Sequence, residues 1–126
     1  MKKILAVLIL GLALAKPIEV KAEPIIHQAT ATAYCITGTT ATGTQTKEGQ
    51  TVASKPEWFG ATMLMWFDEG DGEIKADNFI GMYTVEDTGG ETIKSGKVID
   101  VYISDYQRAK EFGEKKVIVQ IVKSEG

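Results

Sequence analysis

The sequence predicts a small, closed, mainly β barrel that carries one short helix. Three observations lead to this fold class: six or seven short apolar runs, the Gly- and Thr-rich turns between them, and a single capped helical segment. Many short strands separated by such turns are typical of small barrels. The chain has 126 residues, which is enough for one domain with one modest core.

The strands are expected where short apolar or alternating runs lie between turn residues. Along 27–35, alanines alternate with polar residues, and along 116–122, Val117, Val119 and Ile121 fall on one face. The other strands are expected at 51–54, 61–67, 79–87 and 98–103.

The helix is expected over 105–112. Ser104 and Gln107 have the spacing of a capping box, and Gly113 supplies the C-terminal stop. Ala109 then faces the core. This helix has about two turns, which is short for a globular protein.

The first 22 residues predict a secretory signal peptide. Lys2 and Lys3 form a positive start, the run 4–15 is apolar, and a small-x-small site allows cleavage after Ala22. The apolar run is too short for a spanning helix, which needs about 20 residues. An uncleaved N-terminal anchor is the alternative.

The expected organisation is therefore a leader at 1–22, a short lead-in at 23–30 and one barrel domain at 31–126. The leader holds four lysines and one glutamate, so its removal takes the net charge from −3 to −6. A domain this acidic, without a basic stripe, is a poor nucleic-acid binder. No stable membrane insertion is expected once the leader is cleaved.

The few cysteine and histidine residues exclude several kinds of chemistry. Cys35 is the only cysteine, so no intramolecular disulfide is possible, and His27 is the only histidine. A Ser-His-Asp triad or a zinc site of His and Cys ligands therefore has no support. No motif indicates a cofactor or a metal, and the oligomeric state stays open.

Carboxylates are the remaining reactive candidates. Asp87 precedes a Thr-Gly-Gly turn, and Asp100 lies in the apolar run "VIDVY". An aspartate near apolar neighbours and a second carboxylate holds its proton to higher pH, as a general acid must. Alternatively, Asp100 faces water and Asp87 only caps its own turn.

The segments "ATAYC", "GTTATG", "VEDTGGETIKSGKVIDVYIS" and "AKEFGEKKVIVQIV" together resemble the three-aspartate (3D) domain of secreted bacterial cell-wall enzymes. That domain is related to the catalytic core of the membrane-bound lytic transglycosylase A family. The resemblance covers residues 31–122. It implies a six-stranded double-psi β-barrel, cleavage of peptidoglycan glycan strands between N-acetylmuramic acid and N-acetylglucosamine, and a location outside the cell or in the bacterial wall.

The resemblance also implies roles for individual residues. It makes Asp100 the single catalytic acid and base, and Asp87 the group that orients or tunes it. A further set of substrate-binding residues is implied: Thr88, Gly89 and Gly90 in the turn, Lys94 after it, Thr42 and Gly43 on the opposite wall, and Tyr34 nearby.

One position departs from the family pattern and keeps other functions open. Lys55 stands before Pro56, where the family usually has an aspartate. The barrel is therefore an active enzyme, a weakened one, or a non-catalytic module that binds wall glycan, with Trp58 as its favoured stacking platform and Trp66 as the second candidate. An aspartic protease is less favoured, because "VIVQIV" lacks the glycine that braces its Asp-Thr-Gly motif.

Overall fold

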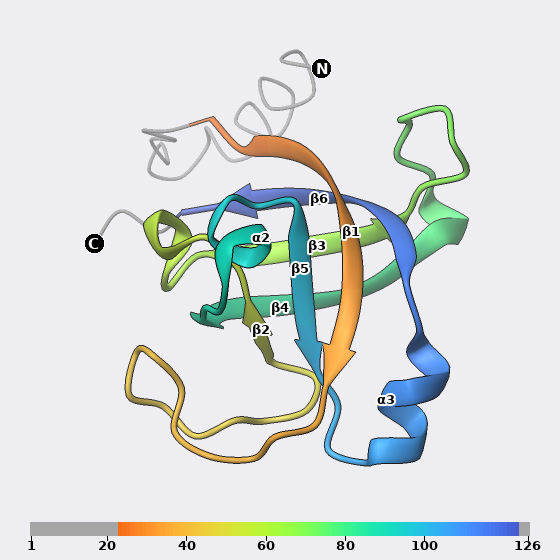
Figure 1. Ribbon diagram of the computed structural model, residues 1–126. Coiled ribbons are helices and arrows are strands. Elements are labelled where there is room, and N and C mark those ends of the chain that lie inside the picture. The colour runs from red at the N-terminus through yellow and green to blue at the C-terminus, as the bar shows by residue number, and fades with distance from the viewer. Residues whose placement is uncertain (1–22, 124–126) are drawn as a thin grey trace, which may run out of the picture.

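Six strands close into a barrel in the computed structural model, which describes residues 23–123 (Figure 1). The strands are β1 (Ile25–Tyr34), β2 (Thr51–Ala53), β3 (Thr62–Phe67), β4 (Phe79–Asp87), β5 (Val98–Tyr102) and β6 (Lys115–Val122). Around the barrel their order is β1-β5-β2-β4-β3-β6. The predicted fold class, a mainly β barrel of six strands with one short helix, is confirmed.

The barrel combines two parallel strand pairs with four antiparallel ones. β1 is parallel to β5 and β2 is parallel to β4, whereas the other four pairings are antiparallel. The strands that flank β1 are β5 and β6, the last two in the sequence. The first strand of the barrel is thus paired with its last two strands.

The inside of the barrel is filled by aliphatic and thioether side chains. Val117, Val119 and Ile121 are all buried, as the alternation in β6 predicted. Met63 and Met65 fill the same core from β3. Truncating a fully buried side chain of this size to alanine costs about 2–5 kcal/mol.

The helix α3 (Tyr106–Phe112) lies close to its predicted position, but its cap was predicted wrongly. Asp105, not Ser104, is the N-cap, because the Asp105 side chain accepts a hydrogen bond from the Arg108 N–H at 2.9 Å. The Ser104 hydroxyl instead donates to the Glu48 carboxylate at 2.8 Å. Gly113 ends the helix with a φ of 63°, as expected.

The described part of the chain also holds three short helical turns: η1 (Pro56–Trp58), η2 (Ala76–Asn78) and α2 (Glu91–Lys94). The turn α2 follows the Thr-Gly-Gly sequence directly and was not predicted. Its four residues are too few to produce a helical pattern in the sequence.

At the N-terminus, the signal peptide expected at 1–22 lies outside the described residues. β1 begins at Ile25, so most of the segment expected as a lead-in, 23–30, already pairs with β6. Between residues 23 and 123, no helix combines the length and the apolar character that crossing a membrane requires.

Candidate active site

Four residues from four neighbouring strands form one row across the barrel. In the pairing registers, Thr32 of β1 lies opposite Asp100 of β5, Asp100 lies opposite Ala53 of β2, and Ala53 lies opposite Asp87 of β4. A β-bulge interrupts the β2–β4 pairing at Ala53. The two carboxylates therefore flank one small side chain, which leaves space between them.

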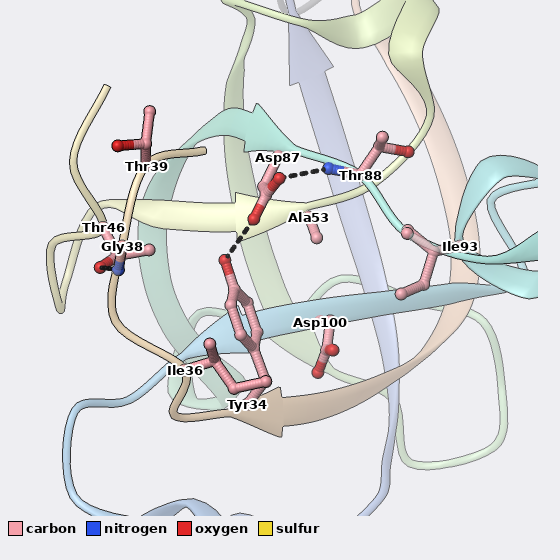
Figure 2. Close-up of a pocket in the computed structure, with 11 residues that line it drawn as sticks. Tyr34, Ile36, Gly38, Thr39, Thr46, Ala53, Asp87, Thr88, Ile93 and Asp100 are labelled. Atoms are coloured by element: carbon pink, nitrogen blue, oxygen red, sulfur yellow. Dashed lines mark hydrogen bonds between the residues drawn. The ribbon is translucent and has the colours of Figure 1, made fainter. Parts of the chain in front are cut away.

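That space is a pocket of about 270 Å³ (Figure 2). Asp87 and Asp100 both line it, together with Tyr34, and Ile36 and Ile93 contribute apolar surface. Among the described residues, no lysine or arginine lines the pocket. Ligand sites usually measure about 300–1,000 Å³, so this pocket fits part of a polymer, and a longer chain has to extend beyond it.

Asp87 is held by three hydrogen bonds. Its Oδ1 accepts from the backbone N–H groups of Ala41 and Thr88, each at 3.0 Å, and its Oδ2 accepts from the Tyr34 hydroxyl at 3.1 Å. Asp87 thus caps its own turn, as one of the two sequence interpretations proposed, and it also ties that turn to β1 and to the loop after β1.

Asp100 has a different environment. It is half-buried, and Thr32 donates a hydrogen bond to its Oδ1 at 2.8 Å. Burial raises the pKa of the Asp100 carboxyl above its ordinary value, the Thr32 hydrogen bond opposes this shift, and the charge of Asp87 adds to it. Among the described residues, Thr32 is the only side chain that donates a hydrogen bond to Asp100.

Tyr34 joins the two sides of the site. Its pKa is raised, first by burial and then by the nearby Asp87 carboxylate, so its hydroxyl stays protonated and donates to Asp87. Its ring packs edge-on against Tyr102, with 5.5 Å between the ring centroids.

The Thr- and Gly-rich loop between β1 and β2 forms one wall of the pocket through Thr39 and Thr46. Thr42 does not line the pocket: its N–H and its hydroxyl both bond the Glu86 carbonyl, at 3.1 and 2.9 Å. Gly43 also lies away from the pocket and makes a tight turn with a φ of 94°. Both residues shape the loop and stay outside the cavity.

The Thr-Gly-Gly turn forms part of another wall. Thr88 and Gly89 line the pocket, and the Thr88 hydroxyl is buried without a hydrogen-bond partner in the described part of the chain. Gly90 is the N-cap of α2. Lys94, at the end of α2, is exposed and does not line the pocket.

Lys55, where the resemblance implies an aspartate, also lies outside the pocket lining. Its ammonium group is 5.0 Å from the centroid of the Trp58 ring and 3.6 Å from the Glu57 carboxylate. The preference for Trp58 as a stacking platform was wrong, because its side chain is only 4% exposed and contacts the His27 ring edge-on. Trp66 is partly exposed and packs against Phe79.

Sequence reasoning missed several residues of the site. Thr32 contacts Asp100, and Ile36, Ala53 and Ile93 line the pocket. Thr32 had one signal: it lies two residues before Tyr34 on the same strand, so both side chains point to one face. The place of Ile93 depends on α2, which no pattern indicated.

The fold and the site define a closed mixed barrel with an acidic pocket at its strand ends. Comparison with protein-family models finds no match, and comparison with curated protein sequences finds none either. Among solved structures, the chain is similar to MltA from E. coli, with 20% identity, a TM-score of 0.50, and coverage of 70% of this chain and 28% of that one.

A second similar structure is an E. coli lytic transglycosylase MltA variant in an apo form. It has 19% identity and a TM-score of 0.52, with coverage of 71% of this chain and 28% of that one. The chain thus spans little more than a quarter of the length of the MltA chains it matches. At this level of identity, the similarity shows a shared fold.

Proposed function

We propose that this protein is a secreted enzyme that cleaves peptidoglycan, a lytic transglycosylase acting between N-acetylmuramic acid and N-acetylglucosamine. Its fold is similar to that of MltA, which is described as a lytic transglycosylase. The observation that carries the proposal is the half-buried Asp100 carboxyl, which lines a pocket together with Asp87 and whose pKa is raised by burial. Cleavage of a glycosidic bond requires an acid that still holds its proton near the working pH.

In the proposed reaction, Asp100 acts first as the acid and then as the base. Its carboxyl proton passes to the glycosidic oxygen as the bond from that oxygen to the anomeric carbon breaks. That anomeric carbon belongs to N-acetylmuramic acid. The Asp100 carboxylate then takes the proton from the 6-hydroxyl of this sugar, and the 6-oxygen bonds to the anomeric carbon. The product is a 1,6-anhydro ring, and Asp100 regains its proton without consuming water.

Asp87 serves a supporting role in this proposal. Its two oxygens already accept three hydrogen bonds, so it is poorly suited to move a proton. Its negative charge raises the pKa of Asp100. Asp87→Asn is therefore expected to slow cleavage less than Asp100→Asn, which removes the transferable proton.

The proposed glycan contacts follow the pocket walls. Thr88 offers a buried hydroxyl that has no hydrogen-bond partner between residues 23 and 123, Gly89 adds no side chain to the turn, and Tyr34 closes the side next to Asp87. Thr42, Gly43, Gly90 and Lys94 lie outside the pocket lining, so we propose that they shape the loops or contact a longer glycan.

A non-catalytic module that binds wall glycan is the second candidate. The observation that favours it is the small, open pocket, which fits only part of a glycan chain. Lys55 no longer favours it, because the Lys55 side chain packs against Trp58 and Glu57. A binding module has no need for an acid with a raised pKa.

The test is digestion of purified peptidoglycan by the protein, with the products analysed by mass spectrometry. Muropeptides lighter by one water than their hydrolysed counterparts are expected, because the anhydro ring forms without water. Asp100→Asn should lower the rate by about 100-fold or more while the barrel stays folded. Ordinary reducing ends would mean a hydrolase, and wall binding without cleavage would favour the binding module.

The proposed place of action is the bacterial cell wall. The leader predicted at 1–22 provides the route of export, and the peptidoglycan glycan strand is the proposed partner. Mass spectrometry of the exported protein tests this part, because cleavage after Ala22 leaves a chain that begins at Glu23. Recovery of the intact N-terminus in a membrane fraction would contradict it.

A further inference from the structure

Thr32 lies next to the proposed acid for a reason that the sequence alone did not reveal. It is paired with Asp100 in the register of the parallel strands β1 and β5. Its hydroxyl donates to Oδ1 of Asp100 at 2.8 Å, and both residues are half-buried. The parallel pairing of β1 with β5 fixes the contact between Thr32 and Asp100, because each strand is also paired on its other side in the closed barrel.

The direction of this hydrogen bond distinguishes the two oxygens of the carboxyl group. A hydroxyl that donates to Oδ1 occupies that oxygen as an acceptor. As long as the Thr32 hydroxyl keeps donating to Oδ1, the proton of the neutral Asp100 carboxyl belongs on Oδ2, since a proton on Oδ1 would oppose that donor. Oδ2 is left without a hydrogen-bond partner among the described residues and is available to a ligand.

We propose that Thr32 is the positioning residue of the active site, and that its hydroxyl orients the Asp100 carboxyl so that Oδ2 carries the transferable proton. This inference rests on the role of Asp100 in the proposed function. Thr32 itself transfers no proton and need not touch the glycan. It fixes the rotation of the acid and stabilises the carboxylate that remains after the proton has left.

The charges around Asp100 make the Thr32 hydrogen bond important for the ionisation of this carboxyl group. Asp87 on β4 is the negative group that faces it, and Tyr34 on β1 stays neutral and donates to Asp87. No lysine or arginine of the described residues lines the pocket. Thr32 is thus the group that favours the ionised form of Asp100 against burial and against Asp87.

The experiment titrates the Asp100 side-chain carboxyl carbon by NMR in the wild type, in Thr32→Val and in Thr32→Ser. Valine keeps the branched shape but has no donor, so the titration midpoint is expected to rise by about one pH unit. Serine keeps the hydroxyl and should bring the midpoint back toward that of the wild type. Thr32→Ala gives the same test if the valine variant does not fold.

Thr30→Val is the matched control, because Thr30 lies on the same strand two residues earlier and is paired with Val98 instead of Asp100. Its midpoint should equal that of the wild type. An unchanged midpoint in folded Thr32→Val, or an equal rise in Thr30→Val, overturns the proposal. A structural role alone would lower stability without moving the titration of Asp100.

Turnover of peptidoglycan provides the second readout. In Thr32→Val, kcat is expected to fall about tenfold, and the alkaline limb of the pH–rate profile should move to higher pH with the midpoint. If the wild type releases no cleaved glycan, the proposed function fails, but the titration still decides the role of Thr32. The two failures are therefore distinguishable.

Discussion

Gly89 and Ile93 fit together only because residue 89 has no side chain. A β-carbon on Gly89 would lie 2.7 Å from Cδ1 of Ile93, which is closer than real side chains approach. Since both residues line the pocket, this contact sets the position of one pocket wall. The Thr-Gly-Gly turn thus acts on the pocket through a neighbouring side chain.

Gly89→Ala is expected to change the shape of the pocket, with little effect on the stability of the fold. The tip of Ile93 is flexible, so it turns away from the new methyl group and alters the pocket wall, at a cost below about 1 kcal/mol in the free energy of unfolding. The affinity for glycan should fall about tenfold. Binding measurements and denaturant unfolding check the two effects.

Two further variants serve as controls for this prediction. Gly90→Ala should leave the Ile93 wall of the pocket in place and lose far less affinity than Gly89→Ala, because a β-carbon there meets nothing within 4 Å and the φ is −74°. The double variant Gly89→Ala with Ile93→Val lacks the clashing Cδ1 and should recover affinity. Equal losses in Gly89→Ala and Gly90→Ala would contradict the explanation.

Asp100→Asn is expected to stabilise the barrel at neutral pH. The folded protein raises the pKa of Asp100 above the ordinary 3.8, so the folded state binds this proton more tightly than the unfolded state. The stabilisation from Asp100 is complete below pH 3.8 and is lost as the pH rises through the folded-state pKa. The uncharged asparagine avoids this loss.

The melting temperature of Asp100→Asn should exceed that of the wild type by about 2–5 °C at pH 7. The difference should disappear below pH 3.8, where both side chains are neutral. Scanning calorimetry at the two pH values checks this expectation. A variant that is less stable than the wild type at pH 7 would contradict this expectation, because it would mean that folding does not raise the pKa of Asp100.

Lys55→Ala is expected to leave cleavage within about twofold of the wild type. The lysine lies outside the pocket lining, over the Trp58 ring and beside Glu57, so its loss removes packing and a cation–π contact worth about 0.5–1 kcal/mol. Peptidoglycan turnover and urea unfolding check the two parts. A tenfold loss of turnover would give Lys55 a role at the site.

The loop between β1 and β2 is fastened to the start of α3, at one end of the barrel (Figure 1), by Glu48. Arg108 and Ser104 donate to the Glu48 carboxylate, and these hydrogen bonds lower its pKa to about 2. A lowered pKa means that the stabilisation from Glu48 is present above pH 4.5 and is lost as the pH falls toward 2.

Glu48→Gln should therefore weaken the contact between this loop and the start of α3 at neutral pH. Amide hydrogen exchange at Ser104, whose N–H donates to Glu48 at 2.9 Å, is expected to quicken about tenfold. Glu57→Gln is the control, since Glu57 makes only a surface ion pair at 3.6 Å. Equal exchange at Ser104 in both variants would mean that the backbone alone holds the loop.

Most of the barrel was predictable because its strands are apolar or alternating runs between turn residues, although Ile118 on the other face of β6 is buried as well. Alternation in β6 identified Val117, Val119 and Ile121 as buried, and turn residues marked the limits of β4. Asp100 was recognised as unusual because it interrupts an apolar strand. These patterns depend only on neighbouring residues, so they can be recognised in the sequence without knowledge of the fold.

The errors concern features that only long-range contacts decide. Trp58 was expected on the surface, but it is buried in the core cluster and packs edge-on against His27, which lies 31 positions away. Ser104 and Asp105 are both good caps, and Glu48 engages Ser104 so that Asp105 caps the helix. Thr32 gains its contact with Asp100 from a parallel pairing that spans 68 residues.

The order of strands also constrains how the chain folds. Of the six barrel strands, β1 is synthesised first, yet both of its neighbours, β5 and β6, follow all the others. A nascent chain that stops before β6 leaves β1 and β3 as open edges, which invite aggregation. Pairing of distant strands also slows folding, with rates typical of milliseconds to seconds. A barrel of this connectivity closes only after β6 has been synthesised, and chains that lack β6 are natural targets for chaperones and proteases.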